Sequence, residues 1–305
     1  MSEQSSISVV ICAMNDERFI ARTITSVISQ GYERLQVHVQ LSRRTSDRTR
    51  EIVEGYPVQL FVEEDSGVPD ALNRGFLATS GEACIFLGAD DPLLPGSIQV
   101  LADTLAANPS AGFVYGDIEY IDAYDQPFQR QTGRSFDVDE MFWYNWVPTQ
   151  SVAVRREALR EVGMYRTGII NADWDLWIRL GARFPSVYVP ALLAQYRVHD
   201  GSNSLNNLHQ MARDTRAVTD SLLEVPDVQV ALRRGEARAR AGGYLWASRL
   251  YTLANAPDEA RRLIVQAIRS YPRAALTKRG IIAGVASMLG GNHFARLRRR
   301  GRAAG

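Results

Sequence analysis

The sequence predicts an α/β protein in which helices cover both faces of a mostly parallel sheet, followed by a helical C-terminal region. Three observations support this prediction. Short apolar runs alternate with amphipathic segments over the first 120 residues, which is typical of βα units. Polar residues directly follow several of the apolar runs, as they do where ligands bind at the carboxyl ends of parallel strands. After Asn206 the pattern is helical and rich in arginine.

The expected strands are short and bounded by polar or turn residues. Continuous apolar runs at Ile7–Ala13 and Ala83–Gly88 indicate strands buried on both faces, and Leu35–Leu41 alternates as a strand does. Gln59–Glu63 and Gly112–Tyr120 complete the set. Parallel strands joined by helices bring their carboxyl ends to one edge of the sheet. The polar segments expected to meet there are Asn15–Glu17, Ser42–Arg44, Glu64–Gly67 and Asp90-Asp91.

The expected helices lie between these strands. Glu17–Gln30 carries apolar residues at helical spacing and ends before Gly31. Ser46 or Asp47 can cap a helix that runs to about Glu54. The remaining expected helices of this part are Pro69–Ala78, with proline in its first turn, and Ser97–Asn108.

The second half of the chain is less regular. A helix is expected around Asp173–Arg183, and Asp258–Tyr271 has the apolar spacing of an amphipathic helix. We expect one domain over residues 1–205, with halves of about 1–120 and 121–205, and a helical, arginine-rich region over residues 206–305.

Charge is divided unevenly along the chain. Residues 229–305 contain 16 basic and 3 acidic residues, a net charge of +13, whereas residues 1–228 contain 19 and 31, a net charge of −12. No apolar run approaches the ~20 residues that span a bilayer. The polar start Met1–Ser6 does not resemble a signal peptide, so a cytoplasmic location is expected.

The basic run Phe294–Arg302 has two interpretations. It is either a solvated chain end or a peripheral contact with anionic lipids at the cytoplasmic face of a membrane. Nucleic acid is not expected as a partner, because the main body is acidic and carries no nucleic-acid motif.

Asp90 and Asp91 directly follow the buried strand Ala83–Gly88. Two adjacent carboxylates repel each other and are costly to bury, and a divalent cation removes that cost. Oxygen ligands favour Mg²⁺ or Mn²⁺, which take further ligands from water and substrate phosphates. The other interpretation is a solvated turn before Pro92, so the pair by itself is a weak signal.

Several ordered motifs resemble those of family 2 glycosyltransferases. Asp65–Gly75 resembles the family's Asp-x-Gly-x-x-Asp-Ala-x-Asn-x-Gly, and Ser8–Glu17 resembles its first strand and nucleotide-contacting end. Ser26–Gln30 resembles its Ser-x-x-x-Gln, and Thr45–Thr49 resembles its Ser-Thr-Asp-Gly-Thr. The resemblance covers about two thirds of the chain. It implies a GT-A fold and transfer of a sugar from a nucleoside-diphosphate donor to an acceptor hydroxyl, with inversion.

The resemblance also assigns roles by position. Asp90 would contact the donor ribose or the metal, and Asp91 would ligate an Mn²⁺ or Mg²⁺ ion that bridges the diphosphate. Asp173 matches the catalytic base, which contributes roughly 10²–10⁴-fold; alternatively it only caps its helix. Asp175 is expected at the surface. The residues expected to bind the donor are Ala13, Asn15, Glu17, Ser42, Asp65, Asp70, Asn73, Asp90 and Arg197.

Residues from the second half of the expected domain receive further roles. Arg197 would pair with the diphosphate, and His199 would ligate the metal or donate to the donor. Gln150 is expected to contact the sugar or the acceptor, with Thr149 where relatives often carry His. Trp174 is expected to bind the acceptor. The aromatic residues that either stack on an acceptor sugar or fill the core are Trp143, Tyr144 and Trp146.

Ser42 departs from the family pattern. Relatives usually end the second strand with an Asp that accepts from uracil N3–H, followed by two glycines, where this chain has Ser42, Arg43 and Arg44. A uridine-diphosphate sugar is the first expectation, and guanosine or thymidine donors stay open. The expected acceptor is sugar-containing or lipid-linked.

Two other functions stay open. A nucleotide-sugar binding module without turnover would also tolerate Ser42, and it would release no nucleoside diphosphate in the presence of acceptor. A nucleotidyltransferase would need a glycine-rich phosphate loop after the first strand, and Ala13–Glu17 contains none.

Overall fold

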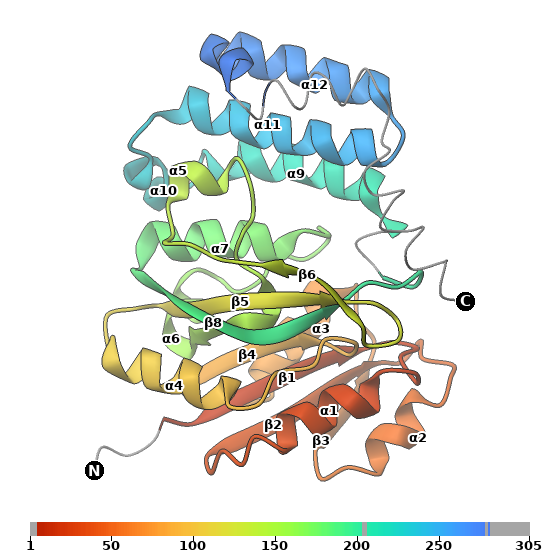
Figure 1. The fold of residues 1–305 in the computed structure, drawn as a ribbon. Coiled ribbons are helices and arrows are strands. Elements are labelled where there is room, and N and C mark those ends of the chain that lie inside the picture. Colours follow the sequence, from red (N-terminus) through yellow and green to blue (C-terminus); the bar gives the residue numbers. More distant parts are fainter. Residues whose placement is uncertain (1–4, 203–205, 278–279, 281–305) are drawn as a thin grey trace. The chain divides into compact units, whose positions relative to one another are not determined.

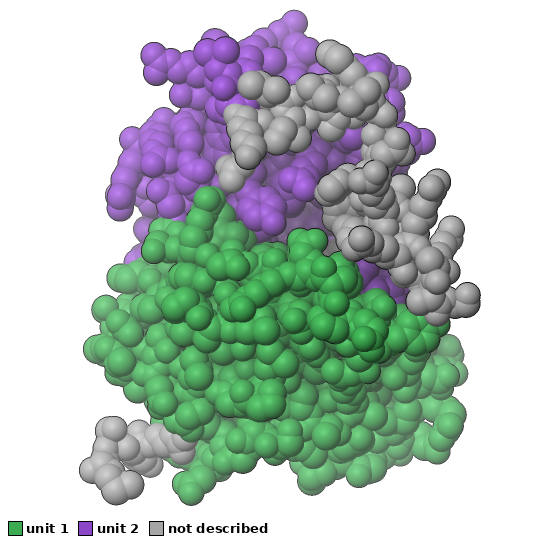
Figure 2. Space-filling view, in the orientation of Figure 1, with its two compact units in different colours: residues 1–136, 146–168, 184–197 green, residues 137–145, 169–183, 198–305 purple. Residues whose placement is uncertain are grey.

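The computed structural model describes residues 5–202, 206–277 and 280 (Figure 1). These residues form two compact units, coloured separately in Figure 2. Unit 1 comprises residues 1–136, 146–168 and 184–197, and unit 2 comprises residues 137–145, 169–183 and 198–305. Residues 137–145 and 169–183 thus belong to the same unit as the C-terminal helices. The predicted domains, residues 1–205 and 206–305, follow different bounds and stay a prediction.

The described strands of unit 1 form one mixed sheet with the order β3-β2-β1-β4-β7-β5-β6, in which β8 also pairs with β5. Strands β1 to β4 are mutually parallel neighbours, and β7 pairs antiparallel with both β4 and β5. The mostly parallel sheet is therefore confirmed. The strands are β1 (Ile7–Ala13), β2 (Leu35–Ser42), β3 (Gln59–Glu63), β4 (Ala83–Gly88), β5 (Phe113–Ile121), β6 (Pro127–Gln131), β7 (Val152–Arg155) and β8 (Ser186–Arg197).

The helices of unit 1 cover both faces of this sheet, as predicted (Figure 1). Alternate residues of β1, such as Val9 and Ile11, pack with Ile24 of α1 in a core cluster that also contains side chains of α2 and α4. On the other face, Gly75 of α3 lies so close to Val10 that an added Cβ would meet its side chain at 2.3 Å. The helices are α1 (Ile20–Ile28), α2 (Thr49–Glu54), α3 (Val68–Leu77), α4 (Ser97–Ala107) and α6 (Arg156–Glu161).

Arg156 fastens the C-terminal end of α3 to the sheet. Arg156 is 7% exposed, and its guanidinium donates to the carbonyls of Phe76 and Gly81 and to the hydroxyl of Thr79. Burial lowers the pKa of this guanidinium. The buried charge is therefore stabilised by neutral oxygen acceptors. One of these acceptors, the Phe76 carbonyl, lies in the last turn of α3, where carbonyl groups have no partner within the helix.

Arg156→Met is expected to destabilise the protein by about 1–3 kcal/mol, because it preserves much of the volume but leaves the buried Gly81 carbonyl without its donor. Arg160→Met is the matched control, since Arg160 is exposed and also lies near the Phe76 ring. Urea unfolding of both variants gives the comparison. Equal stabilities would contradict the anchoring role of Arg156.

Unit 2 is helical in its described part, which confirms the predicted helical C-terminal region. None of the described helices is both long and apolar enough to cross a bilayer. The predicted basic run Phe294–Arg302 lies outside the described residues. The helices are α5 (Val138–Met141), α7 (Ala172–Arg183), α9 (Leu208–Leu222), α10 (Pro226–Ala231), α11 (Glu236–Leu253) and α12 (Pro257–Ser270), followed by a 3₁₀ helix (Pro272–Leu276).

The prediction that Asp175 lies at the surface is wrong. Asp175 is 0% exposed, and its carboxylate pairs with Arg179 one turn further along α7 at 2.6 Å. Since Arg179 is itself only 6% exposed, the two charges are buried together, which makes the burial of either one tolerable.

Candidate functional site

The carboxyl ends of the parallel strands meet at one edge of the sheet, as predicted. Ala13 at the end of β1 lies opposite Leu41 of β2, and Cys12 lies opposite Gly88 at the end of β4. Ser42 ends β2 opposite Glu63 of β3. The loops that follow these strands therefore carry their polar side chains into one neighbourhood.

The two acids after β4 differ in their surroundings. Asp91 is 4% exposed; its Oδ1 accepts the backbone N–H of Arg197 at 2.9 Å, and its Oδ2 accepts from Nε2 of Gln150 at 2.7 Å. Asp90 is partly exposed. Burial, and then the charge of Asp90, hold the pKa of Asp91 well above its usual range. Asp91 is thus an anchored, buried acid, and Asp90 is the more accessible one.

Gly88 brings the two carboxylates close together. A Cβ added at Gly88 would lie 2.8 Å from Oδ1 of Asp90 and 3.2 Å from Oδ2 of Asp91. The absence of a side chain at Gly88 therefore leaves the space in which both carboxyl groups stand. This is a close-approach role of glycine.

Negative charge accumulates around this pair. Burial, and then the charges of Asp16, Asp90 and Asp91, raise the pKa of the Cys12 thiol. No cluster of three or more His, Cys, Asp or Glu side chains suited to a metal occurs among the described residues. The arrangement fits a cation that takes one or two carboxylates from the protein and the rest from water and phosphate, as Mg²⁺ and Mn²⁺ do.

Asn15 and Glu17, both predicted to bind the donor, connect the loop after β1 to the loop after β2. Asn15 has a left-handed backbone, with φ of 60°, and its side-chain oxygen accepts the N–H of Ser46. The carboxylate of Glu17 accepts the N–H of Arg48, while Asp47 accepts the N–H of Glu17. The two residues therefore fix the shape of these loops, and their contact with a donor stays a prediction.

Ser42 is contacted by Arg44, a residue that was not among the predicted site residues. Arg44 donates from Nε to the Ser42 hydroxyl at 3.4 Å and from Nη2 to Asp65 at 2.8 Å. Asp65 also accepts the N–H of Gly67. Ser42 is 5% exposed. Arg44 thus bridges the ends of β2 and β3, and the basic pair Arg43-Arg44, where the family resemblance expected glycines, was the signal that could have identified it.

Asp70 and Asn73 shape the start and the anchoring of α3. The Asp70 carboxylate accepts the N–H of Ser66. This hydrogen bond contributes most to lowering the pKa of the Asp70 carboxyl. The Asn73 amide both donates to the carbonyl and accepts from the N–H of Tyr165. These contacts are structural, and a direct contact of either side chain with the donor stays a prediction.

Unit 2 contains the predicted base and the predicted third metal ligand. Asp173 lies in the first turn of α7, is partly exposed, and accepts from Nδ2 of Asn145 at 3.2 Å. His199 is partly exposed, and its Nδ1 accepts the N–H of Gly201. Trp174 is 1% exposed and donates to the carbonyl of Met141. The structure gives Trp174 a packing role, and its contact with the acceptor stays a prediction.

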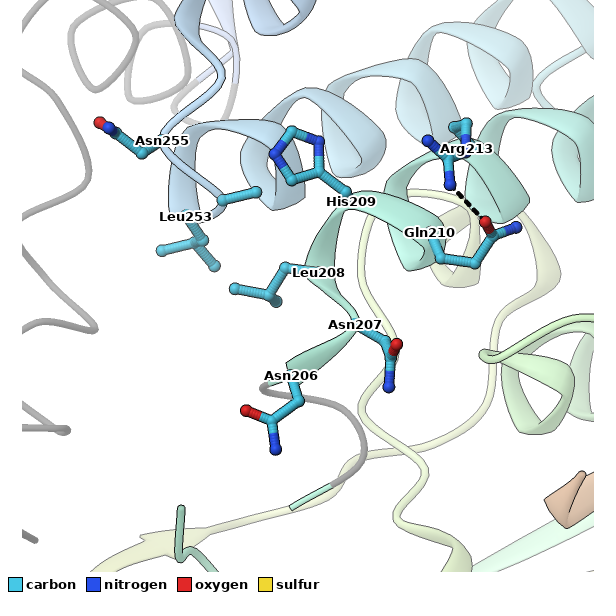
Figure 3. Close-up of a pocket in the computed structure, with 9 residues that line it drawn as sticks. Asn206, Asn207, Leu208, His209, Gln210, Arg213, Leu253 and Asn255 are labelled. Carbon is cyan, nitrogen blue, oxygen red and sulfur yellow. Dashed lines mark hydrogen bonds between the residues drawn. The ribbon is translucent and has the colours of Figure 1, made fainter. Parts of the chain in front are cut away.

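A hollow of about 520 Å³ in unit 2 was not predicted (Figure 3). It lies at the start of α9 and the end of α11, and Gln210 and Arg213 are hydrogen-bonded in its wall. Asn255 carries a left-handed backbone, with φ of 59°. Because asparagine is common in such turns, no residue of this segment pointed to a hollow in advance. The lining residues are Asn206, Asn207, Leu208, His209, Gln210, Arg213, Leu253, Ala254 and Asn255.

Comparison with known proteins agrees with the geometry of unit 1. Residues 8–163 match the family model described as glycosyl transferase family 2. An uncharacterised glycosyltransferase of Nostoc sp. is 24% identical over 222 residues, which are 66% of this chain and 67% of the relative. A PGL/p-HBAD biosynthesis glycosyltransferase of Mycobacterium bovis is 28% identical over 201 residues, which are 62% of this chain and 72% of the relative.

Two solved structures share the fold. Residues 1–349 of S. aureus TarS, in complex with UDP-GlcNAc, align with a TM-score of 0.66 and 13% identity over 97% of this chain and 92% of that one. The mannosyltransferase PcManGT of Pyrobaculum calidifontis, in complex with GDP-Man and Mn²⁺, aligns with a TM-score of 0.56 and 16% identity over 96% and 88%. The GT-A fold that the resemblance implied is thus confirmed. The chain belongs to glycosyl transferase family 2 and is a glycosyltransferase that uses a nucleotide-sugar.

Proposed function

We propose that this enzyme transfers a sugar from a nucleoside-diphosphate sugar to a hydroxyl of a sugar-containing or lipid-linked acceptor, with inversion and with the help of a divalent cation. The observation that carries the proposal is the asymmetric acidic pair at the end of β4. Asp91 is anchored by two hydrogen bonds, while Asp90 is the more accessible carboxylate beside it. Such a pair suits an ion held jointly by protein and diphosphate.

Asp90 is the primary ligand in this proposal, with Asp91 supporting it and His199 as a further ligand. This order refines the sequence prediction, which favoured Asp91. The burial of Asp91 and the use of both its oxygens by Gln150 and Arg197 support the change. When bound, Mg²⁺ or Mn²⁺ would stabilise the charge of the leaving nucleoside diphosphate.

Asp173 is the proposed general base. Its carboxylate is partly exposed at the start of a helix whose next residues, Trp174 and Asp175, are buried. These buried neighbours fix the helix, so that the carboxylate is held in a defined position. The Asn145 amide donates to one of its oxygens. This contact orients the carboxylate that would remove the acceptor proton.

The donor is proposed to carry uridine first, with guanosine and thymidine as alternatives. TarS was solved with UDP-GlcNAc and PcManGT with GDP-Man, so the fold accommodates both bases. The Arg44–Ser42 contact replaces the charged acceptor of the family pattern with a hydroxyl and a guanidinium. A guanidinium can donate to the carbonyl oxygens of uracil, thymine or guanine, which is why all three donors are tested.

The test is thermal unfolding with UDP-, GDP- and dTDP-sugars, each with and without MnCl₂. A ligand at 100 times its Kd stabilises the folded state by about 2.7 kcal/mol, so one donor series is expected to raise the Tm by several degrees when Mn²⁺ is present. Stabilisation by none of the three series would contradict the proposed function. Stabilisation that is equal without Mn²⁺ would remove the cation from it.

A further inference from the structure

We propose that Arg197 and Asp125 form a positioning pair that couples the turn of the β5–β6 hairpin to the acidic residues Asp90 and Asp91. The inference rests on the proposed function, because it concerns the same site. It also gives Arg197 a different role from the predicted pairing with the donor diphosphate.

The backbone N–H and the Nε of Arg197 contact the two acids. The residue ends β8 and is 1% exposed. Its backbone N–H donates to Oδ1 of Asp91 at 2.9 Å, and its Nε donates to the carbonyl of Asp90 at 3.1 Å. A shift of Arg197 would therefore move the side chain of one acid and the backbone of the other at the same time.

The Nη1 of Arg197 contacts the turn of the β5–β6 hairpin. This nitrogen lies 2.6 Å from Oδ1 of Asp125 and donates to the carbonyl of Asp122 at 2.9 Å. The turn is tightly formed, because the Asp122 carboxylate accepts the N–H groups of Tyr124 and Gln126. Asp125 has a left-handed backbone, with φ of 67°. The buried guanidinium thus spans the distance between a rigid turn and the acidic pair.

The surroundings of the guanidinium are built to keep it in place. The ring of Phe19 lies 4.6 Å from its central carbon, a distance at which a cation is attracted to an aromatic face. Because Arg197 is almost fully buried, its charge needs the Asp125 carboxylate as a partner. Removal of that carboxylate is expected to let the guanidinium reorient and to release the Asp90 carbonyl.

Arg22 provides an internal comparison. It pairs with the second carboxylate oxygen of Asp125, and its Nη2 donates to the side chain of Gln195. Both arginines therefore fasten the same turn through the same carboxylate. Among their described contacts, those of Arg197 reach Asp90 and Asp91, whereas those of Arg22 do not. A role in merely fastening the hairpin would make the two arginines equivalent, whereas a positioning role makes them different.

The experiment compares Arg197→Lys, Asp125→Asn and Arg22→Lys with the wild type. Each full-length variant is titrated with MnCl₂ in the presence of UDP, or of GDP or dTDP if that nucleotide stabilises the wild type, and its Tm is measured separately. Arg197→Lys and Asp125→Asn are expected to weaken Mn²⁺-dependent nucleotide binding at least ~10-fold, since small displacements of site groups have large effects. Arg22→Lys is expected to bind within about twofold of the wild type, although its Tm also falls.

The outcomes distinguish a failure of the proposed function from a failure of the positioning role. A wild type without Mn²⁺-dependent nucleotide binding would contradict the proposed function, and with it the positioning role. If the wild type binds and Asp125→Asn binds as tightly as Arg22→Lys, only the positioning role is overturned. Asp125→Asn keeps Arg197 in the chain and removes only the charge that pairs with it, so this variant decides the question even if Arg197→Lys does not fold.

Discussion

Asp173→Asn is expected to lower sugar transfer at least ~100-fold, while the affinity for nucleotide with Mn²⁺ stays within about twofold. The amide has nearly the shape of the carboxylate, so the first turn of α7 and the packing of Trp174 beneath it are preserved. An amide, however, cannot take a proton from the attacking hydroxyl. Transfer is measured as nucleoside diphosphate released from the donor that stabilises the wild type, with alkyl glycosides or water as acceptor.

Asp173→Ser separates this role from helix capping. Serine keeps a short polar side chain in the first turn of α7, so a purely structural Asp173 would be replaced with little loss of activity. We expect Asp173→Ser to be as inactive as Asp173→Asn and close to the wild type in Tm. Full activity in either variant would remove Asp173 from the chemistry.

Asp90→Asn is expected to weaken Mn²⁺-dependent nucleotide binding at least ~100-fold, because loss of a direct ligand exceeds the 10–100-fold effect of losing a residue that only supports a ligand. Because Asp90 is partly exposed, the accompanying loss of stability is expected to be small. The measurement is isothermal titration of nucleotide at fixed MnCl₂. Asp103→Asn, which alters an exposed carboxylate on α4, serves as the control and is expected to bind as the wild type does.

Asp91→Asn is expected to fail in a different way. Both oxygens of Asp91 accept from N–H groups, those of Gln150 and Arg197, and an asparagine NH₂ would face one of these donors. The loss of a buried hydrogen bond costs about 1–3 kcal/mol of stability. Asp91→Asn is therefore expected to lower both Tm and affinity. If instead Asp90→Asn binds normally and Asp91→Asn abolishes binding at unchanged Tm, the two assignments must be exchanged.

The elements with local sequence patterns were predicted well. β1 and β4 are continuous apolar runs, and α1 and α3 carry a helical apolar face or a proline in the first turn, so neighbouring residues determine them. Strand β6 is polar and β7 has four residues. Their pairing depends on strands that are distant in sequence, and periodicity carries no information on such partners.

The same distinction holds for the site. The ends of β1, β2 and β4 converge because parallel topology requires it, and this was predictable. The two hydrogen bonds between Asn73 and Tyr165 join residues 92 positions apart. The role of Arg197 depends on a turn more than seventy residues earlier. Motif matching finds such residues but does not reveal which partner each one serves.

The late insertion of β7 between β4 and β5 has a consequence for synthesis on the ribosome. Until residues 152–155 have emerged, β4 lacks its neighbour on one side, and until residue 197 has emerged β5 lacks β8. The nascent chain therefore carries apolar strands with open edges for a large part of its translation, and such edges promote aggregation. A fragment that ends near residue 136 is expected to be insoluble, and the full chain is expected to express best when a chaperone is abundant.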